Sequence, residues 1–376
     1  MASTYSDFRS ALATVFARME QRVRYAPDVL LARATAALGK AAPLGTGEAA
    51  ACVGLIAEHT IFFDGFSAFL GTPFASGACA GEGLGRVLYD GPAREPVRVV
   101  LDALCRSSGL GVDLAVHSAI PTGLSTTAVL TAAAAGSRAL MSAGVDWPEE
   151  DLPDIIAEAI GVAYDVPVGI DHVVATLAGR PNAILLADAH TRSRRVFEYA
   201  EGEIAWGLVV TDATSQVPDQ FYENRRAQYD ALMAHLRTSA FPDLESLRDL
   251  EHRQMQSAGD ALPAPLQPVL RFLGRENQRV QRFGAAARAQ NWHLAGGLLV
   301  MGQSATEADW GGASVLAPYF ELGRGAEDLY GARVVDGAFG TAMLVMGLPM
   351  AVAAFLDRSE QLHERHTGAP AQTYLF

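Results

Sequence analysis

The sequence predicts an α+β protein built as two lobes. Its 376 residues, half of them hydrophobic, can bury at least one large core and are numerous enough for two. Segments with helical spacing and segments that read as buried strands follow one another without an internal repeat. This order is typical of the α+β class.

The composition narrows the class of protein further. A formal net charge of −13 argues against a surface that binds nucleic acid. No run of about eighteen uncharged apolar residues reads as a membrane span, and the opening residues MASTYSDFRSALATVF lack the charged-then-apolar order of a signal peptide. We therefore expect a cytoplasmic protein with no nucleic-acid and no membrane partner. Cys52, Cys79 and Cys105 form no CxxC pair and are expected to be free thiols.

The first half of the chain predicts helix, then strand, then helix. Residues 5–39 have helical spacing, the Gly/Pro-containing stretch 39–47 follows, and 49–56 reads as a strand. A second strand is expected at 112–120. The tripeptide PTG ends it, and the alanine-rich segment STTAVLTAAAAGSRALMSAG at 125–144 is expected to be a long helix.

The second half predicts further strands and helices. Buried strands are expected at 183–189 and 206–213, helices at 224–240 and 265–302, and a late strand at 332–347. The segment RFLGRENQRVQRFGAAAR within the second of these helices is rich in arginine. We expect it to be a solvated helix face and not a binding patch.

A charged cluster interrupts the apolar stretch CVGLIAEHTIFFDGF. Glu58, His59 and Thr60 stand side by side there. A carboxylate that is removed from water costs several kcal/mol unless it is paired or hydrogen-bonded. The cluster is therefore either satisfied by neighbouring groups or kept for a ligand.

The turn PTGLSTTA is a candidate anion site. Gly123 permits close approach of a backbone, and Ser125, Thr126 and Thr127 fall at the start of the predicted helix. Free N–H groups and the partial positive charge at a helix N-terminus suit a phosphate, and the hydroxyls add donors or a magnesium ligand. The alternative is that Ser125 or Thr126 simply caps the helix.

Two further segments contain candidate site residues. Asp171 opens an apolar helical segment after a Pro/Gly turn, where a carboxylate is also an ordinary feature of a helix start. In VVDGAFGTAM, Gly337 and Gly340 flank Phe339 inside a strand pattern. Glycines in that setting indicate a bulge or a backbone that another group approaches closely.

In this order the motifs resemble those of the GHMP kinase superfamily, and within it the galactokinases. LIAEHTIFFDGF is similar to the galactokinase signature LIGEHTDYNGGF, and IPTGLSTTA is similar to the phosphate loop IPxGxGLSSSA. GIDHVVATLAGRPNAILLAD resembles GIMDQxxxLxGxxxxALLID. YENRRAQYDAL and ARVVDGAFGTAML resemble the later YNxRRxxCexA and RxTGGGFGGC segments. The resemblance extends over most of the chain.

The resemblance implies a fold and a set of site residues. It implies mixed sheets with flanking helices, an N-terminal lobe over 1–187, a C-terminal lobe over 188–376, and an active site in the cleft between them. Asp171 would be the catalytic carboxylate, and ATP and Mg²⁺ the cofactors. Substrate-binding residues would be Glu58, His59, Asp64 and Gly169. ATP would be held by Gly123, Ser125, Thr126, Thr127, Gly337 and Gly340, with Ser125 and Thr126 also binding the metal.

The sequence departs from the galactokinase pattern at the sugar site and at the phosphate site. Cys52 stands where the family has an arginine, and Ile61 where it has a sugar-binding aspartate. The phosphate loop has only Thr122 between its proline and the glycine of the GLS motif. In the last motif, three side chains stand where the family prefers glycine, namely Asp336, Ala338 and Thr341.

Two classes of function follow from these matches and departures. The first is an ATP-dependent kinase that phosphorylates a hydroxyl, such as the anomeric one, of a modified sugar, a sugar phosphate or a cyclitol rather than galactose. The second is a galactokinase-like protein that has lost phosphoryl transfer and either binds a ligand or performs different chemistry in the same cleft. Asp171 and the hydroxyl-rich turn favour the first class, and the shortened loop and the altered glycines favour the second.

Overall fold

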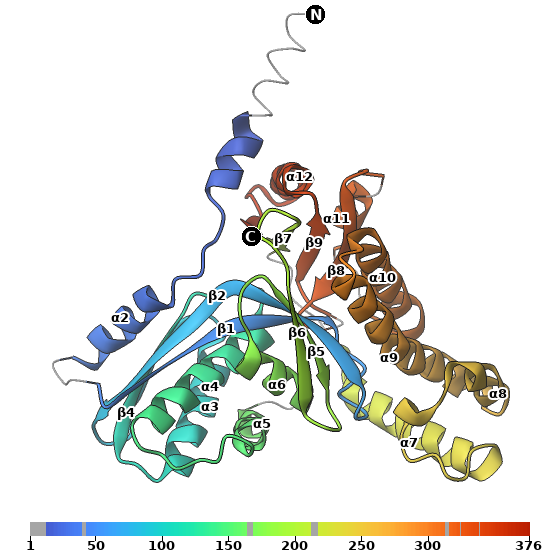
Figure 1. Cartoon of the computed structure of the whole chain (residues 1–376), viewed down its shortest axis with the longest axis horizontal. Helices are drawn as coiled ribbons and strands as arrows, with labels where there is room; N and C mark the ends of the chain where they lie inside the picture. Colours follow the sequence, from blue (N-terminus) through green and yellow to red (C-terminus); the bar gives the residue numbers. More distant parts are fainter. Residues whose placement is uncertain are drawn as a thin grey trace, which may run out of the picture.

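Two β-sheets form the frame of the molecule, which we describe from a computed structural model for residues 13–39, 43–163, 168–211, 217–312, 316–323, 325–337 and 339–376 (Figure 1). The first sheet has the order β3-β4-β2-β5-β6, with β1 paired to β2, and the second has the order β10-β7-β9-β8. The strands of the first sheet are β1 (Gly45–Ile56), β2 (Phe66–Glu82), β3 (Val87–Asp90), β4 (Val112–Ser118), β5 (Ala183–Asp188) and β6 (Ser193–Glu198). Those of the second are β7 (Ala205–Val210), β8 (Leu329–Val335), β9 (Ala342–Gly347) and β10 (Gln372–Leu375).

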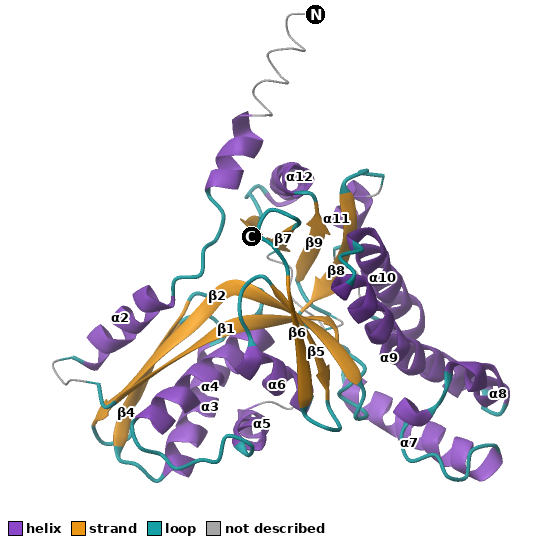
Figure 2. Ribbon diagram, in the orientation of Figure 1, coloured by secondary structure: helices purple, strands orange, loops and turns teal. Residues whose placement is uncertain are grey.

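Helices flank both sheets (Figure 2). The first sheet is mixed, because β3 and β4 run parallel whereas its other strand pairs are antiparallel. The predicted α+β class with mixed sheets and flanking helices is therefore confirmed. The helices are α2 (Pro27–Leu38), α3 (Arg94–Ser108), α4 (Ser125–Ser142), α5 (Leu152–Ala163), α6 (Ile170–Ala178), α7 (Phe221–Ser239), α8 (Met255–Asp260), α9 (Gln267–Arg288), α10 (Trp292–Ala305), α11 (Ala317–Gly323) and α12 (Pro349–Thr367).

The long strand β2 is covered on both faces. Its alternate residues point to opposite sides, so Ala78 and Ala80 join the core under α3 and α4, whereas Cys79 packs with Ala34 of α2. Figure 1 shows α2 on one side of this sheet and α3 with α4 on the other. Small residues in β2 therefore allow helices to pack on each face.

The C-terminal half of helix α4 lies very close to β1. A Cβ at Gly45 would stand 2.4 Å from the carbonyl oxygen of Ala139, and one at Gly47 would stand 2.3 Å from that of Ala135. Only glycine in the strand, facing alanine in the helix, permits this approach. The helix that carries the hydroxyl residues at its start is consequently packed directly against β1.

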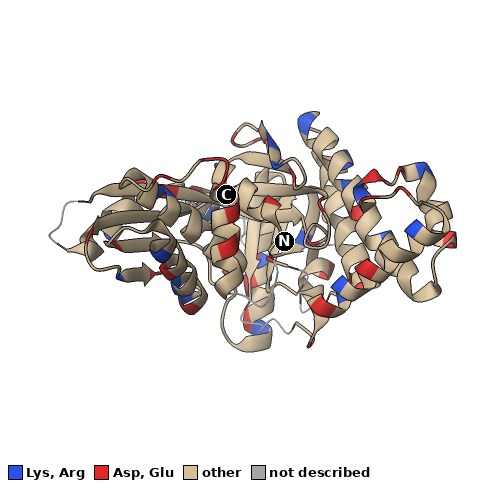
Figure 3. Ribbon diagram, turned by 90° about the horizontal axis from the view of Figure 1, so that it is seen from below, with Lys and Arg blue, Asp and Glu red and all other residues tan. Residues whose placement is uncertain are grey.

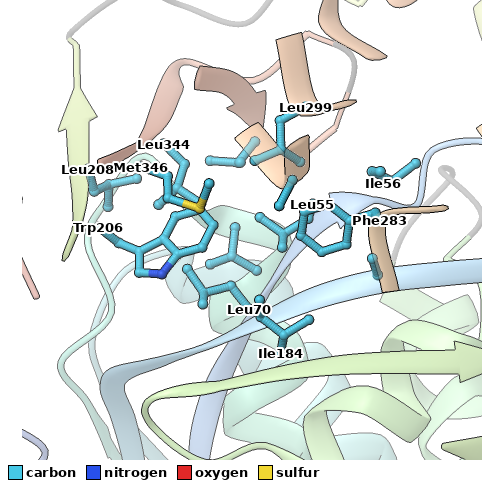
Figure 4. Close-up of a cluster of buried hydrophobic side chains, with 14 of the residues drawn as sticks. Leu55, Ile56, Leu70, Ile184, Trp206, Leu208, Phe283, Leu299, Leu344 and Met346 are labelled. Atoms are coloured by element: carbon cyan, nitrogen blue, oxygen red, sulfur yellow. The ribbon is translucent and has the colours of Figure 1, made fainter. Parts of the chain in front are cut away.

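A central hydrophobic core joins the two sheets to α9 and α10 (Figure 4). The side chains in it come from distant parts of the chain, including Leu55, Leu70, Ile184, Trp206, Phe283, Leu299, Leu344 and Met346. The first sheet extends beyond residue 187, since β5 pairs with β6. A lobe boundary between 187 and 188 stays a prediction.

Three predicted elements are each divided in the structure. Residues 13–20 are helical, but 21–26 are not, and α2 begins at Pro27, because proline disfavours a helical conformation in the residue before it. The predicted helix 265–302 is α9 and α10, separated at Gln290, which has φ 53°, and at the capping residue Asn291. The predicted strand 332–347 is the hairpin β8–β9.

The arginine-rich helix face is only partly solvated. Arg275, Arg282 and Arg288 of α9 are exposed, as predicted, but Arg279 is buried in an ion pair with the buried Glu276. The prediction was therefore wrong for Arg279, because a buried carboxylate one helical turn away stabilises its charge. Elsewhere in the view of Figure 3, acidic and basic residues are interspersed along the ribbon.

Two expectations from composition can be compared with the structure. Cys52, Cys79 and Cys105 are buried free thiols, as predicted. Within the described ranges, none of the helices has the length and apolar character needed to cross a membrane.

Candidate functional site

The N-terminus of α4 binds a carboxylate of the chain itself. The backbone N–H of Thr126 donates to Asp336 Oδ2 over 2.9 Å, and the N–H and hydroxyl of Thr127 both donate to Asp336 Oδ1 over 3.0 Å. No side chain at the N-cap position makes a capping hydrogen bond. Asp336 therefore accepts the hydrogen bonds of the free N–H groups at the start of α4. The alternative expectation, a cap by the side chain of Ser125 or Thr126, was wrong.

The β8–β9 turn presents Asp336 to α4. Asp336 has φ 67° and Gly337 has φ 102°, both in the left-handed region, and a Cβ at Gly340 would stand 1.8 Å from the carbonyl oxygen of Val335. Burial raises the pKa of Asp336, although the hydrogen bonds from Thr126 and Thr127 act in the opposite direction. Ala338, which stands where the galactokinase pattern has glycine, lies outside the described residues.

Asp171 is completely buried at the start of α6. Its Oδ2 accepts a hydrogen bond of 2.9 Å from Thr60 Oγ1, and its Oδ1 lies 3.6 Å from Nδ1 of His172. Burial acts to raise the pKa of Asp171, but the charge of His172 and the hydrogen bonds together hold this pKa below its ordinary value. A Cβ at Gly169, the N-cap residue, would stand 2.3 Å from Oδ1, so glycine there makes room for the carboxylate.

Glu58 is paired with a buried arginine. Its Oε2 accepts a hydrogen bond of 2.6 Å from Arg333 Nη2, and Arg333 Nη1 lies 3.3 Å from Oε2 of Glu276. Glu276 in turn forms an ion pair with Arg279. The charges of two carboxylates and two guanidinium groups thus balance each other. The charge of Glu58 is therefore neutralised by a residue of the protein itself.

His59 points into the protein. It is fully buried, and its Nε2 donates a hydrogen bond of 2.8 Å to the carbonyl oxygen of Phe66. Nδ1 has no hydrogen-bond partner among the described residues. Burial lowers the pKa of His59 to about 4, so the ring is neutral at pH 7.

This lowered pKa predicts an acid-sensitive contribution to stability. Unfolding returns His59 to a pKa of about 6.5, so protonation favours the unfolded chain as the pH falls from about 6.5 towards 4. Between pH 7 and pH 5 the free energy of unfolding should fall by about 2 kcal/mol from this group. Urea denaturation of wild type and His59→Gln at both pH values measures it. Parallel pH dependence in the two proteins would contradict the assignment.

One cavity brings most of the predicted site residues together. Its volume is about 230 Å³, and Glu58, the start of α4 and the β8–β9 turn line it. The predicted residues on its wall are Glu58, Gly123, Ser125, Thr126, Thr127, Gly337 and Gly340. Residues of both halves of the chain therefore form this cavity.

Four predicted residues do not line the cavity. His59 and Gly169 lie beside it in the buried surroundings of Asp171, and Asp171 itself lies behind His172, which does reach the cavity wall. Asp64 is exposed instead, with its carboxylate 3.7 Å from His190 Nδ1 and its carbonyl oxygen accepting from Arg248. The role of Asp64 in binding substrate stays a prediction.

The sequence interpretation missed three residues of the site. His172 lines the cavity, Arg333 neutralises Glu58, and Tyr222 contributes a phenol whose pKa burial raises to about 12. His172 follows Asp171 directly, and this adjacency was an available signal. Arg333 is the second residue of the ARVVDGAFG segment but is 275 positions from Glu58, so no local pattern links the two.

The two departures at the predicted sugar site lie at or near the cavity. Cys52 Sγ donates to the carbonyl oxygen of Ala175 over 3.3 Å, and burial raises the pKa of this thiol to about 12. Cys52 therefore carries no charge toward Asp171. Ile61 also lines the cavity and makes its wall less polar at that point.

Known proteins resemble this chain in sequence and in fold. No protein-family model matches it. Galactokinases from Chloroflexus aggregans and Chloroflexus aurantiacus are 28% and 25% identical over 61% and 70% of this chain. The matches span 59% and 67% of the length of those relatives.

The solved structures establish the fold. A Lactococcus lactis galactokinase complexed with galactose superimposes with a TM-score of 0.77 at 18% identity, covering 93% of this chain and 97% of the other. The L. major mevalonate kinase in complex with R-mevalonate gives a TM-score of 0.58 at 12% identity, over 89% of this chain and 98% of the other. The chain is therefore galactokinase-like and has the fold of the GHMP kinase superfamily.

Proposed function

We propose that this protein is a small-molecule kinase that transfers a phosphoryl group from ATP to a hydroxyl of a modified sugar, a sugar phosphate or a cyclitol. The observation that carries the proposal is the position of Asp171. This carboxylate is buried, its pKa is held below the ordinary value, and its Oδ1 lies 3.6 Å from Nδ1 of His172, which lines the same cavity as the N-terminus of α4. A carboxylate beside a phosphate-binding helix end suits phosphoryl transfer to a hydroxyl.

The cavity residues divide into two groups in this proposal. Asp171, oriented by Thr60, would hold or accept the proton of the acceptor hydroxyl, while Glu58 would contact the substrate. Ser125 and Thr126 with Gly337 and Gly340 would hold ATP and Mg²⁺, which supplies positive charge for the phosphates. The N–H groups of Thr126 and Thr127 are occupied by Asp336, so phosphates fit this end of α4 only if Asp336 moves.

Galactose should be a poor substrate. The two sequence relatives and one of the two structural neighbours described above are galactokinases, but Cys52 is uncharged and Ile61 is apolar where the galactokinase pattern has two polar partners. A sugar whose hydroxyls find no hydrogen-bond partner in the site binds with lower affinity. A screen of sugars, sugar phosphates and cyclitols that measures ADP release tests this. Turnover of galactose equal to that of the best compound would overturn the expectation.

Isothermal titration tests the kinase proposal most directly. The wild-type protein should bind ATP in the presence of Mg²⁺, and at least one compound of the screen should give ATP-dependent turnover. Absence of both nucleotide binding and turnover would reject the proposal.

The second candidate is a galactokinase-like protein that no longer transfers phosphate. The contact between Asp336 and α4 favours it, because a negative charge already occupies the helix end that would attract phosphates. Such a protein would bind a neutral, polar ligand in the cavity beside Glu58 and His172.

Replacement of Asp336 separates the two candidates. Asp336→Asn should bind ATP with Mg²⁺ at least about tenfold more tightly than wild type, because it removes one negative charge close to the phosphates. Asp90→Asn, which removes an exposed carboxylate elsewhere, is the matched control. Nucleotide binding only in Asp336→Asn would support the second candidate. Weaker binding by Asp336→Asn would instead assign Asp336 to holding Mg²⁺.

A further inference from the structure

The wall of the cavity carries several negative groups and a single basic side chain. Among the described residues that line it, His172 is basic, and none is lysine or arginine. Glu58 and Asp336 stand on the same wall, and Asp171 lies directly behind it. A phosphoryl-transfer site needs positive charge, so the state of His172 matters for its chemistry.

The geometry directs His172 toward Asp171. Its Nδ1 lies 3.6 Å from Asp171 Oδ1, within ion-pair distance, and neither atom has a hydrogen-bond partner among the described residues. The other carboxylate oxygen is held by Thr60. The imidazole packs edge-on against Phe69, with ring centroids 4.9 Å apart at 79°, which limits its rotation.

Burial differs between the two partners. The side chain of Asp171 is 0% exposed and that of His172 is 18% exposed, so the histidine is the member of the pair that reaches the cavity. The carboxylate therefore depends on the imidazole for a cationic neighbour. Cys52, which stands where the galactokinase pattern has an arginine, cannot supply this charge.

We propose that His172 is a positioning residue that, as an imidazolium, holds the Asp171 carboxylate ionised and fixes the direction of its Oδ1. His172 thus replaces the charge partner that the arginine would provide. The consequence for turnover rests on the proposed kinase function, but the pairing of His172 with Asp171 can be measured without any substrate.

The groups that face His172 favour its protonated form. The acidic groups are Asp171 on α6, Glu58 after β1 and Asp336 on the β8–β9 turn. The thiol of Cys52 and the phenol of Tyr222 on α7 also face the cavity, but both stay neutral because each has a pKa of about 12. Burial lowers the pKa of His172, but these carboxylates, Asp171 above all, raise it above its ordinary value.

Nuclear magnetic resonance titration of the histidine rings tests the pairing. In wild type, His172 should titrate above the ordinary pKa of about 6.5, and in Asp171→Asn its pKa should fall by at least about one unit. His117, which pairs with Asp90 outside the cavity, is the internal control and should not move. A wild-type His172 that titrates at or below the ordinary value would overturn the proposal, as would an unchanged pKa in Asp171→Asn.

His172→Gln extends the test to the carboxylate and to turnover. The pKa of Asp171, followed by the carboxyl ¹³C signal, should rise in this variant, which keeps the test decisive if Asp171→Asn does not fold. With an active substrate, kcat should fall about tenfold with KM nearly unchanged. Wild type should lose activity at alkaline pH, where His172 deprotonates, and His172→Gln should not show this loss. If wild type has no turnover, the kinase proposal fails, and the two titrations still decide on His172.

Discussion

Asp171→Asn should lower the turnover rate by about 10²–10⁴-fold while the KM for the acceptor changes little. A positioned general base contributes a factor of this size, and an amide of the same shape cannot accept the hydroxyl proton. The asparagine oxygen can still accept the hydrogen bond from Thr60, so the local geometry should persist. Steady-state kinetics with the best substrate of the screen measures the effect.

The same substitution at another helix start is the matched control. Asp28 lies in the first turn of α2 and is exposed, so Asp28→Asn alters only a carboxylate at a helix N-terminus. It should cost at most about 1 kcal/mol of stability and leave turnover unchanged. If Asp171→Asn behaves in the same way, with a lowered Tm and nearly wild-type turnover, Asp171 has no part in the reaction.

Local patterns predicted the elements on which the site depends. The break at the tripeptide PTG and the alanine-rich run located α4 within a few residues, and the Pro/Gly turn located the start of α6. These signals are strong because capping and chain breaks act over a few residues. These local patterns therefore selected the hydroxyls of α4 and Asp171 as candidate site residues.

The strand β2 was not predicted, although it is the longest in the protein. Its sequence FSAFLGTPFASGACAGE contains Pro73 and several glycines, which are typical of turns. The structure gives a different reason for the glycines. A Cβ at Gly71 would stand 1.9 Å from the carbonyl oxygen of Arg180, and one at Gly77 would stand 2.7 Å from the N of Leu31. Tertiary packing, which no local pattern records, selects small residues in this strand.

The pairings that decide the chemistry of the site are long-range. Asp336 lies 210 positions from Thr126 and Arg333 lies 275 positions from Glu58. The comparison with the galactokinase pattern identified Asp336 as a departure from glycine, but not that its carboxylate binds the start of α4. The register of the β8–β9 hairpin determines that contact.

Arg333→Met should lower the free energy of unfolding by about 3–5 kcal/mol. The side chain of Arg333 is buried and pairs with both Glu58 and Glu276, so its removal leaves Glu58 without a cationic partner in the interior and Glu276 with Arg279 alone. Arg358→Met removes an exposed arginine and should change stability by at most about 0.5 kcal/mol. Urea denaturation of both variants and wild type measures the difference.

A double variant shows where the cost of Arg333→Met arises. If the unpaired charge of Glu58 causes much of the loss, Arg333→Met combined with Glu58→Gln should be more stable than Arg333→Met alone. Equal stability of the single and double variants would place the cost at Glu276 instead. Recovery would mean that Arg333 fixes the charge and orientation of Glu58 on the cavity wall. The negative charge of Glu58 would then already be balanced by a buried arginine of the protein. A neutral, hydroxyl-bearing ligand could therefore bind to Glu58 without bringing its own cation.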